Sequence, residues 1–198
     1  EGRHLILLLA TICVVSAQKM QCSHTTTDTS NNKQITFYLD AFSFDPSDTK
    51  DFLMGFEASA KSNFAINLCQ DAQQAFACGQ PTPVCQQDSG GVSNSCGALS
   101  TWQLTDWKDP NTQTPNPAGG VLASVTGGTQ CPNRQRQSNV YLTCKTGIPN
   151  RPAQAVITEP QPPNECIYTI PFESPCFCPG GGGCSGGGSG DFDAGWVF

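Results

Sequence analysis

Charged side chains are scarce in this chain, at 13% of its 198 residues, and acidic residues outnumber basic ones by 16 to 10. The formal net charge is −6, and no stripe of basic residues runs along the sequence. Proteins that bind nucleic acid rely on clustered Lys and Arg to neutralise phosphates. The composition therefore argues against a nucleic-acid partner. The polar positions are filled mainly by Gln, Asn, Thr and Ser, which favours recognition through hydrogen bonds.

Histidine is nearly absent, with two residues in the whole chain. Zinc sites need closely spaced Cys and His ligands. The nearest approach to such a cluster is Cys176, Cys178 and Cys184, which has no histidine beside it. We therefore expect neither a metal nor a cofactor.

An enzyme is disfavoured for a similar reason. His24 is the single histidine beyond the N-terminal segment, and it lies in a Thr/Ser-rich stretch. The acidic pair Asp106 and Asp109 has no catalytic motif around it. We therefore predict a binding protein and no catalytic residues.

No apolar run reaches the roughly 20 residues that a membrane-spanning helix needs. The run at residues 5–15 is shorter, follows Arg3 and ends in Ser16-Ala17. This pattern is typical of a secretory signal peptide with a small-residue cleavage site, so residues 1–17 are predicted to be removed. A buried core helix is the alternative interpretation.

The C-terminal segment, residues 179–198, is predicted to be a Gly/Ser-rich linker that leads to a membrane anchor. Gly and Ser supply too little apolar surface for packing. Phe192, Trp196 and Phe198 follow, and aromatic residues gather at membrane interfaces. We expect a transmembrane helix beyond Phe198, as in a type I single-pass protein. An ordinary C-terminus is the alternative.

Cysteine is abundant once the signal peptide is removed: 181 residues (198 − 17) retain eleven of the 12 cysteines. That density indicates disulfides formed in an oxidising lumen. The length of residues 18–178 suits one domain.

Hydrophobic residues alternate with polar ones throughout, and helical periodicity is nearly absent. This pattern predicts an all-β fold, a disulfide-stapled flattened β-barrel or sandwich of two antiparallel sheets. A helical turn is expected only within residues 71–76. Strands are expected at residues 35–39, 64–68, 99–104, 120–125, 139–144, 153–157 and 166–172.

Four polar residues stand at fixed offsets from cysteines. Gln86 directly follows Val84-Cys85, Arg136 lies five residues after Cys131 and eight before Cys144, Glu159 lies nine before Tyr168, and Tyr168 lies two after Cys166. Together these offsets resemble the mannose 6-phosphate receptor homology (MRH) domain. That family includes mannose 6-phosphate receptors, lumenal quality-control lectins and autophagy-related sorting receptors. The resemblance covers residues 22–178, and its specific motifs lie in 84–178.

The resemblance implies that Gln86, Arg136, Glu159 and Tyr168 ring the hydroxyls of a mannose. Gln87 is the fallback for the glutamine. Arg134 and Glu165 fit the offsets poorly. Phosphate-binding members carry an acidic residue just before the cysteine that matches Cys131, where this chain has Gln130. Cation-assisted phosphate binding therefore has no support from the sequence, and the phosphorylation of the ligand stays open.

The resemblance also implies two disulfides, Cys131–Cys166 and Cys144–Cys178, around the site. The remaining cysteines leave alternatives. Local pairing would give Cys69–Cys78, Cys85–Cys96 and Cys176–Cys184 and leave Cys22 unpaired. Alternatively, Cys22 pairs with Cys69.

In function, the resemblance implies a lumenal lectin-type sorting receptor for mannose-type glycans on cargo, with or without phosphate, in Golgi–endosome–lysosome trafficking. A weak single site would be amplified by multivalent cargo or by a homodimer. The alternative is an autophagy-related membrane sorting protein that uses the same fold to hold protein partners.

Overall fold

The computed structural model describes residues 22–28, 32–46, 52–109, 116, 119–160, 165–180 and 184. The predicted signal peptide, nearly all of the predicted linker and the aromatic C-terminus lie outside these residues. Within them, no helix combines the length and the apolar character that crossing a membrane requires.

The described residues form eleven β-strands and four short 3-10 helices. A two-stranded sheet pairs β1 (Ser23–Asp28) with β2 (Lys33–Tyr38). A five-stranded sheet has the order β10 (Ala155–Val156), β3 (Leu53–Glu57), β4 (Ser62–Ile66), β5 (Val84–Gln87), β6 (Ser93–Ser95). A four-stranded sheet has the order β11 (Ile167–Ser174), β9 (Gln137–Cys144), β8 (Gly120–Val125), β7 (Gln103–Asp106). The 3-10 helices are η1 (Asp40–Phe42), η3 (Gln73–Ala75), η4 (Leu99–Thr101) and η6 (Pro175–Phe177).

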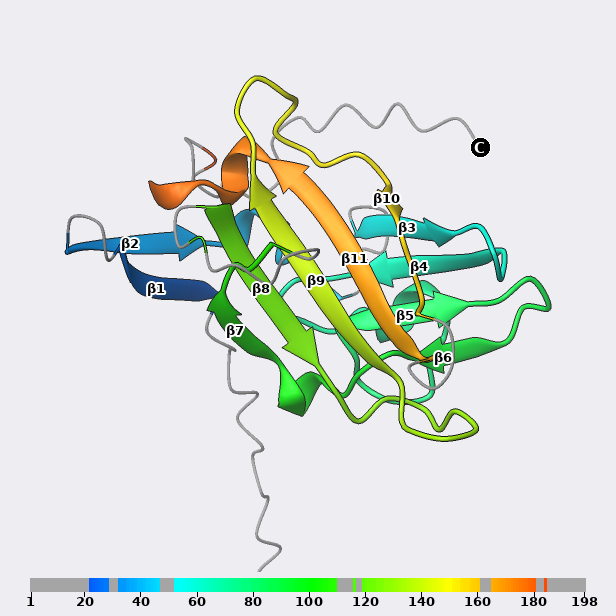
Figure 1. The fold of residues 1–198 in the computed structure, drawn as a ribbon. Helices are drawn as coiled ribbons and strands as arrows, with labels where there is room; N and C mark the ends of the chain where they lie inside the picture. The colour runs from blue at the N-terminus through cyan, green and yellow to red at the C-terminus, as the bar shows by residue number, and fades with distance from the viewer. Residues whose placement is uncertain are drawn as a thin grey trace, which may run out of the picture.

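The five- and four-stranded sheets lie against each other as a flattened sandwich, with β9 and β11 crossing in front of β3–β6 in Figure 1. Most strand pairs are antiparallel, as predicted. However, β11 pairs with β9, and β10 with β3, in parallel. Parallel pairing is possible there because long connections separate the paired strands in the sequence.

The core lies between these two sheets. On β11 every second residue is buried, among them Tyr168, Ile170 and Phe172. Side chains of a strand alternate between its two faces, so one face of β11 fills the core. Phe64 of β4 reaches the same core from the opposite sheet. Each such side chain contributes about 1.5–3 kcal/mol when it is fully buried.

The two sheets meet along one edge. Thr158, just after β10, exchanges two backbone hydrogen bonds with Thr169 of β11, with N···O distances of 3.1 and 2.9 Å. Because β10 belongs to one sheet and β11 to the other, this bridge closes that side of the sandwich. The antiparallel pairing also brings Glu159 opposite Tyr168.

The strand predictions hold best where alternation is strong. Residues 120–125 coincide with β8, and residues 139–144 lie within β9. Residues 99–104 are partly wrong, because the chain first turns as η4 and β7 begins at Gln103. The turn predicted in residues 71–76 is the 3-10 helix η3.

Five disulfides join ten of the eleven cysteines that the structure describes. The pairs are Cys22–Cys69, Cys78–Cys85, Cys131–Cys166, Cys144–Cys178 and Cys176–Cys184. The pairs Cys131–Cys166 and Cys144–Cys178 are those that the resemblance implies, and Cys22–Cys69 is the pair expected as the alternative. Cys96 is free and buried.

Two of the local pairings are wrong: Cys69–Cys78 and Cys85–Cys96. The cause is the alternation of faces along β5. Cys85 points out of the sandwich, into a small second core that also holds Cys78. Cys96 and Cys69 belong to the main core. Short sequence separation therefore does not bring these pairs together.

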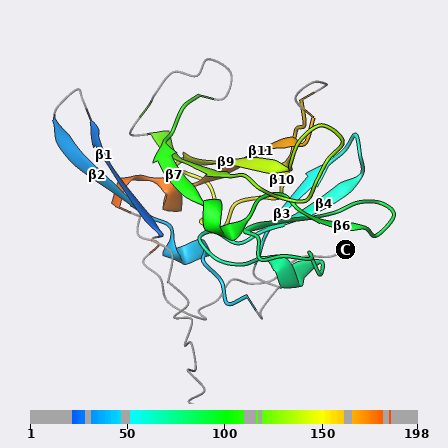
Figure 2. The same ribbon diagram turned by 90° about the horizontal axis from the view of Figure 1, so that it is seen from below.

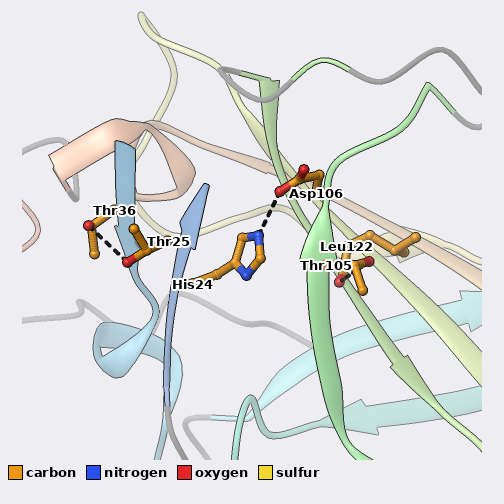
Figure 3. Close-up of polar contacts among 6 residues, drawn as sticks. All are labelled: His24, Thr25, Thr36, Thr105, Asp106 and Leu122. Atoms are coloured by element: carbon orange, nitrogen blue, oxygen red, sulfur yellow. Dashed lines mark hydrogen bonds and ion pairs between the residues drawn. The ribbon is translucent and has the colours of Figure 1, made fainter. Parts of the chain in front are cut away.

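A hairpin of β1 and β2 stands beside β7, as Figures 1 and 2 show. His24 of β1 contacts Asp106 of β7, with 2.8 Å between Nε2 and Oδ1 (Figure 3). Burial raises the pKa of Asp106, but hydrogen bonds from His24 and Thr26 outweigh it and hold that pKa below its usual value. The Asp106 carboxylate is thus an anchor for the hairpin.

We predict that residues 18–198 contain one reactive thiol once the chain is unfolded without reductant. Burial raises the pKa of the Cys96 thiol, so alkylation of the folded protein should be slow. Peptide mapping after alkylation in concentrated guanidinium chloride should find the label at Cys96. A label at Cys85 or Cys69 would contradict the pairing.

We also predict that Asp106→Ala loosens the hairpin. Amide hydrogen exchange in β1 and β2 should accelerate, while β9 keeps its protection. Glu173→Ala is the matched control, because its contact with Lys145 is an ion pair between half-exposed side chains and contributes at most about 1 kcal/mol. Equal exchange of the hairpin in both variants would refute an anchoring role for Asp106.

Candidate functional site

Gln86 lies on the inner face of β5. In the sheet it stands opposite Phe64 of β4, and it is only 5% exposed. Gln87, the fallback for the same role, is partly exposed, and as the next residue of the strand it faces the other way. The structure therefore places Gln86, and not Gln87, inside the sandwich.

Tyr168 reaches Gln86 from the opposite sheet. It is the first buried residue of β11, and its hydroxyl donates to Oε1 of Gln86 at 3.3 Å. Its ring packs edge-on against Phe64, with the ring centroids 5.0 Å apart. Burial, followed by the nearby Cys96 and Glu159, raises the pKa of Tyr168, so the phenol stays a hydrogen-bond donor at neutral pH.

Arg136 immediately precedes β9 and is held by its backbone. Its N–H donates to Thr129 at 3.0 Å, and its carbonyl accepts from Gly128 at 2.9 Å. One guanidinium nitrogen, Nη1, donates to the carbonyl of Gln130 at 3.1 Å, whereas Nε is buried and has no hydrogen-bond partner. The guanidinium is close enough to the Tyr168 hydroxyl to act against the rise in the pKa of that phenol.

Gly128 makes this position of Arg136 possible. A Cβ atom at residue 128 would lie 2.6 Å from the nitrogen of Gly97 and 2.8 Å from the carbonyl oxygen of Arg136. Three backbone segments meet here: the end of β6, the loop after β8 and the start of β9. Glycine is needed because only a residue without a side chain allows so close an approach.

Glu159 follows the Thr158–Thr169 bridge and so lies opposite Tyr168. Its Oε1 accepts a hydrogen bond from the N–H of Cys166. Burial raises the pKa of Glu159; the charge of Glu57 raises it further, while the Cys166 N–H and Arg136 act against this. Glu165 contacts Asn133 in an exposed hydrogen bond instead, in line with its poor fit to the sequence offsets.

The predicted residues Gln86, Arg136, Glu159 and Tyr168 are therefore brought to one end of the sandwich. They come from four separate segments of the chain. We call this group the polar cluster. It offers a buried amide, a guanidinium, a carboxylate and a phenol, which together can donate and accept hydrogen bonds.

Sequence reasoning missed three residues beside the polar cluster. Cys96 has its Sγ 3.8 Å from Oε1 of Gln86. Glu57 ends β3 and is 2% exposed, and Ser62, opposite it on β4, is fully buried. The signal that could have found Glu57 is strand parity, since it shares a face with Leu53 and Gly55.

Within the described part of the chain, no group of three or more His, Cys, Asp or Glu residues is arranged to hold a metal ion. The polar cluster contains one carboxylate, one guanidinium and no histidine. The chemistry that these groups offer is hydrogen bonding.

Comparison with known proteins gives a likeness in fold. No protein-family model matches the chain, and no curated protein matches it in sequence. Domain 11 of the chicken IGF2R is similar in structure, with a TM-score of 0.54 and 17% identity over 78% of this chain and 90% of that one. Domain 11 of the echidna mannose 6-phosphate/IGF2R receptor has a TM-score of 0.53 and 12% identity over 80% and 96%.

A weaker match is the MRH domain of Yos9 complexed with alpha3,alpha6-Man5, with a TM-score of 0.37 and 11% identity over 63% of this chain and 76% of that one. At identities this low the likeness concerns the fold alone. The chain has an MRH-like fold, as its cysteine-referenced motifs predict.

We predict that the pKa of Glu159 lies above its ordinary value of 4.5 and responds to two neighbours in opposite directions. Glu57→Gln should lower this pKa, because it removes a like charge. Arg136→Gln should raise it, because it removes an opposite charge. Titration of the carboxyl carbon by NMR measures both shifts, with Glu173→Gln as the control. A value below 4.5, or shifts of the same sign in both variants, would contradict the arrangement.

Proposed function

We propose that this domain binds a mannose-type sugar at the polar cluster. The observation that carries the proposal is the hydrogen bond between Tyr168 and Gln86, two residues 82 positions apart that come from opposite sheets. Glu159 stands opposite Tyr168 through the Thr158–Thr169 bridge, and Arg136 precedes the β9 residue that pairs with Ile167. These are the same four residues that the cysteine offsets single out.

The chemistry of the cluster suits a hexose. The hydroxyls of a sugar both donate and accept hydrogen bonds, in directions that the ring fixes. Arg136 supplies only donors, Glu159 only acceptors, and Gln86 both. The Nε of Arg136 is buried without a partner, and a hydroxyl oxygen is a suitable acceptor for it.

Selectivity between sugars follows from the cost of unpaired groups. A hydrogen bond to a charged group contributes about 1.5–3 kcal/mol, whereas a buried polar group left without a partner costs about 1–3 kcal/mol or more. A sugar that directs one hydroxyl away from Arg136 or Glu159 therefore loses the bond and also leaves the charge unpaired. An axial and an equatorial hydroxyl are distinguished in this way.

In the cell we propose that the domain is the lumenal part of a type I sorting receptor for glycoprotein cargo in the Golgi–endosome–lysosome system. The five disulfides support an oxidising compartment. The apolar segment at residues 5–15 and the Gly/Ser-rich stretch before the aromatic C-terminus support secretion and anchoring. A homodimer would raise the avidity of a weak site.

One observation favours a second function, the binding of a protein partner. Phe56 and Val156 are neighbours on β3 and β10, and they are 37% and 70% exposed on the outer face of the sheet. Adjacent apolar side chains that remain exposed are a common feature of protein interfaces. The same fold would then serve sorting without a sugar.

The sugar proposal predicts that the folded domain binds methyl α-mannoside and high-mannose glycans. Arg136→Ala should abolish measurable binding, and Tyr168→Phe should weaken it by about fivefold or more, because one buried hydrogen bond is lost. Binding is measured by NMR titration and on a glycan array. Phe56→Ser, on the outer face, is the matched control and should bind like the parent.

Absence of binding to every high-mannose glycan, with the domain folded, would reject the sugar proposal and support the protein-binding alternative. Binding that survives both Arg136→Ala and Tyr168→Phe would place the sugar elsewhere on the molecule.

A further inference from the structure

A buried carboxylate that the sequence motifs do not include lies beside the polar cluster. Glu57 is the last residue of β3 and is 2% exposed. Its Oε1 accepts a hydrogen bond from the Ser59 hydroxyl, and its Oε2 is buried with no hydrogen-bond partner. Burial of a carboxylate is costly unless it is paired, so a Glu in this position calls for an explanation.

Strand register shows that Glu57 faces the site. Parallel pairing of β10 with β3 sets Ala155 beside Gly55, and therefore residue 157 beside residue 57. Ala155 and Ile157 are buried, so Glu159 is the next position on the inward face. Glu57 and Glu159 thus point into the same end of the sandwich from neighbouring segments.

Strand β4 adds a third polar side chain to Glu57 and Glu159. Ser62 of β4 stands opposite Glu57, is fully buried, and has an Oγ atom without a partner. Unpaired polar atoms of Glu57, Ser62 and Arg136 are thus gathered at the end of the interior that holds the polar cluster. Buried polar groups in native proteins are nearly always paired, so these atoms call for a partner from outside the chain, either water or a polar ligand.

The charges at this end do not balance. The charged side chains that act on the Glu159 carboxyl are Glu57, Arg136 and Glu165. The pKa of Cys96, which lies beside Gln86, is affected by the charges of Arg136, Glu159 and Glu57. Two buried or half-buried carboxylates therefore face one guanidinium, and the third carboxylate adds to the excess of negative charge.

We propose that Glu57 is a specificity-determining residue, whose buried carboxylate makes this site select an uncharged hexose over the phosphorylated sugar. The inference rests on the sugar-binding function proposed above and names its ligand class. The hydroxyls of a neutral hexose can donate to Oε2 of Glu57, whereas a phosphate offers acceptors and negative charge. Arg136 alone cannot neutralise a phosphate and two carboxylates.

The size of the effect follows from charge interaction at short range. A bound sugar places its phosphate within a few ångströms of the ring, and the screening length at physiological salt is about 8 Å. Partly buried charges at such distances are screened less than exposed ones. We therefore expect mannose 6-phosphate to bind about fivefold or more weakly than methyl α-mannoside.

The test compares the dissociation constants of mannose 6-phosphate and methyl α-mannoside by NMR titration of the folded domain. Glu57→Gln should reduce the ratio of the two constants by about threefold or more, because it removes one negative charge. Glu57→Asp, which keeps the charge, should retain the preference. Glu173→Gln is the matched control, because Glu173 lies on β11 in a half-exposed ion pair with Lys145. The ratio of the two dissociation constants in this variant should equal that of the parent. Raising the salt concentration should bring the ratio of the two dissociation constants closer to one in the parent.

A ratio that is unchanged in Glu57→Gln, or a parent that prefers mannose 6-phosphate, overturns the role of Glu57 and leaves the sugar proposal standing. A parent that binds neither sugar overturns both. Glu57→Met, a neutral side chain of similar length, gives the same comparison should Glu57→Gln fail to fold.

Discussion

The hydrogen bond from Tyr168 to Gln86 joins the two sheets at the point where the aliphatic core gives way to polar side chains. A buried amide and a buried phenol each need a partner, and here they supply it to each other. The Phe64 ring beneath them fixes where Tyr168 can stand. The bridge that precedes Glu159 sets that residue opposite Tyr168, while backbone hydrogen bonds to Gly128 and Thr129 hold Arg136 at the start of β9.

Much of the fold could be predicted because its central strands alternate strongly. β8, β9 and β11 carry apolar residues at every second position, and the resemblance supplied the two cysteine pairs that clamp them. The short strands β3, β5 and β6 could not be recognised in the same way. Both faces of β5 are buried, since a second small core covers its outer face, and so its residues do not alternate in polarity. The same second core explains why proximity in sequence misled the pairing of Cys85.

In the site, only residues at a characteristic spacing from a cysteine or from one another could be predicted from the sequence. Gln86, Arg136, Glu159 and Tyr168 are each tied to a nearby cysteine or to one another, so counting along the chain found them. Glu57 has no cysteine nearby and is followed by a turn of small and polar residues, where a carboxylate is normally solvated. Its inward direction follows from strand parity once β3 is known, but its place beside Glu159 depends on the register between β3 and β10, which brings together segments far apart in the sequence. Local sequence carries no record of that pairing.

The bridge between Thr158 and Thr169 joins the two sheets through main-chain atoms alone. Because main chain pairs with main chain there, the spacing of the sheets beside Glu159 does not depend on which side chains stand on them. Point substitutions in the polar cluster can therefore exchange one set of hydrogen-bond donors and acceptors for another while this spacing stays the same. To widen the spacing, a descendant of this chain would have to insert residues beside the bridge, a rarer event than substitution. The chemistry of the cluster and the spacing of the sheets are thus free to evolve at different speeds.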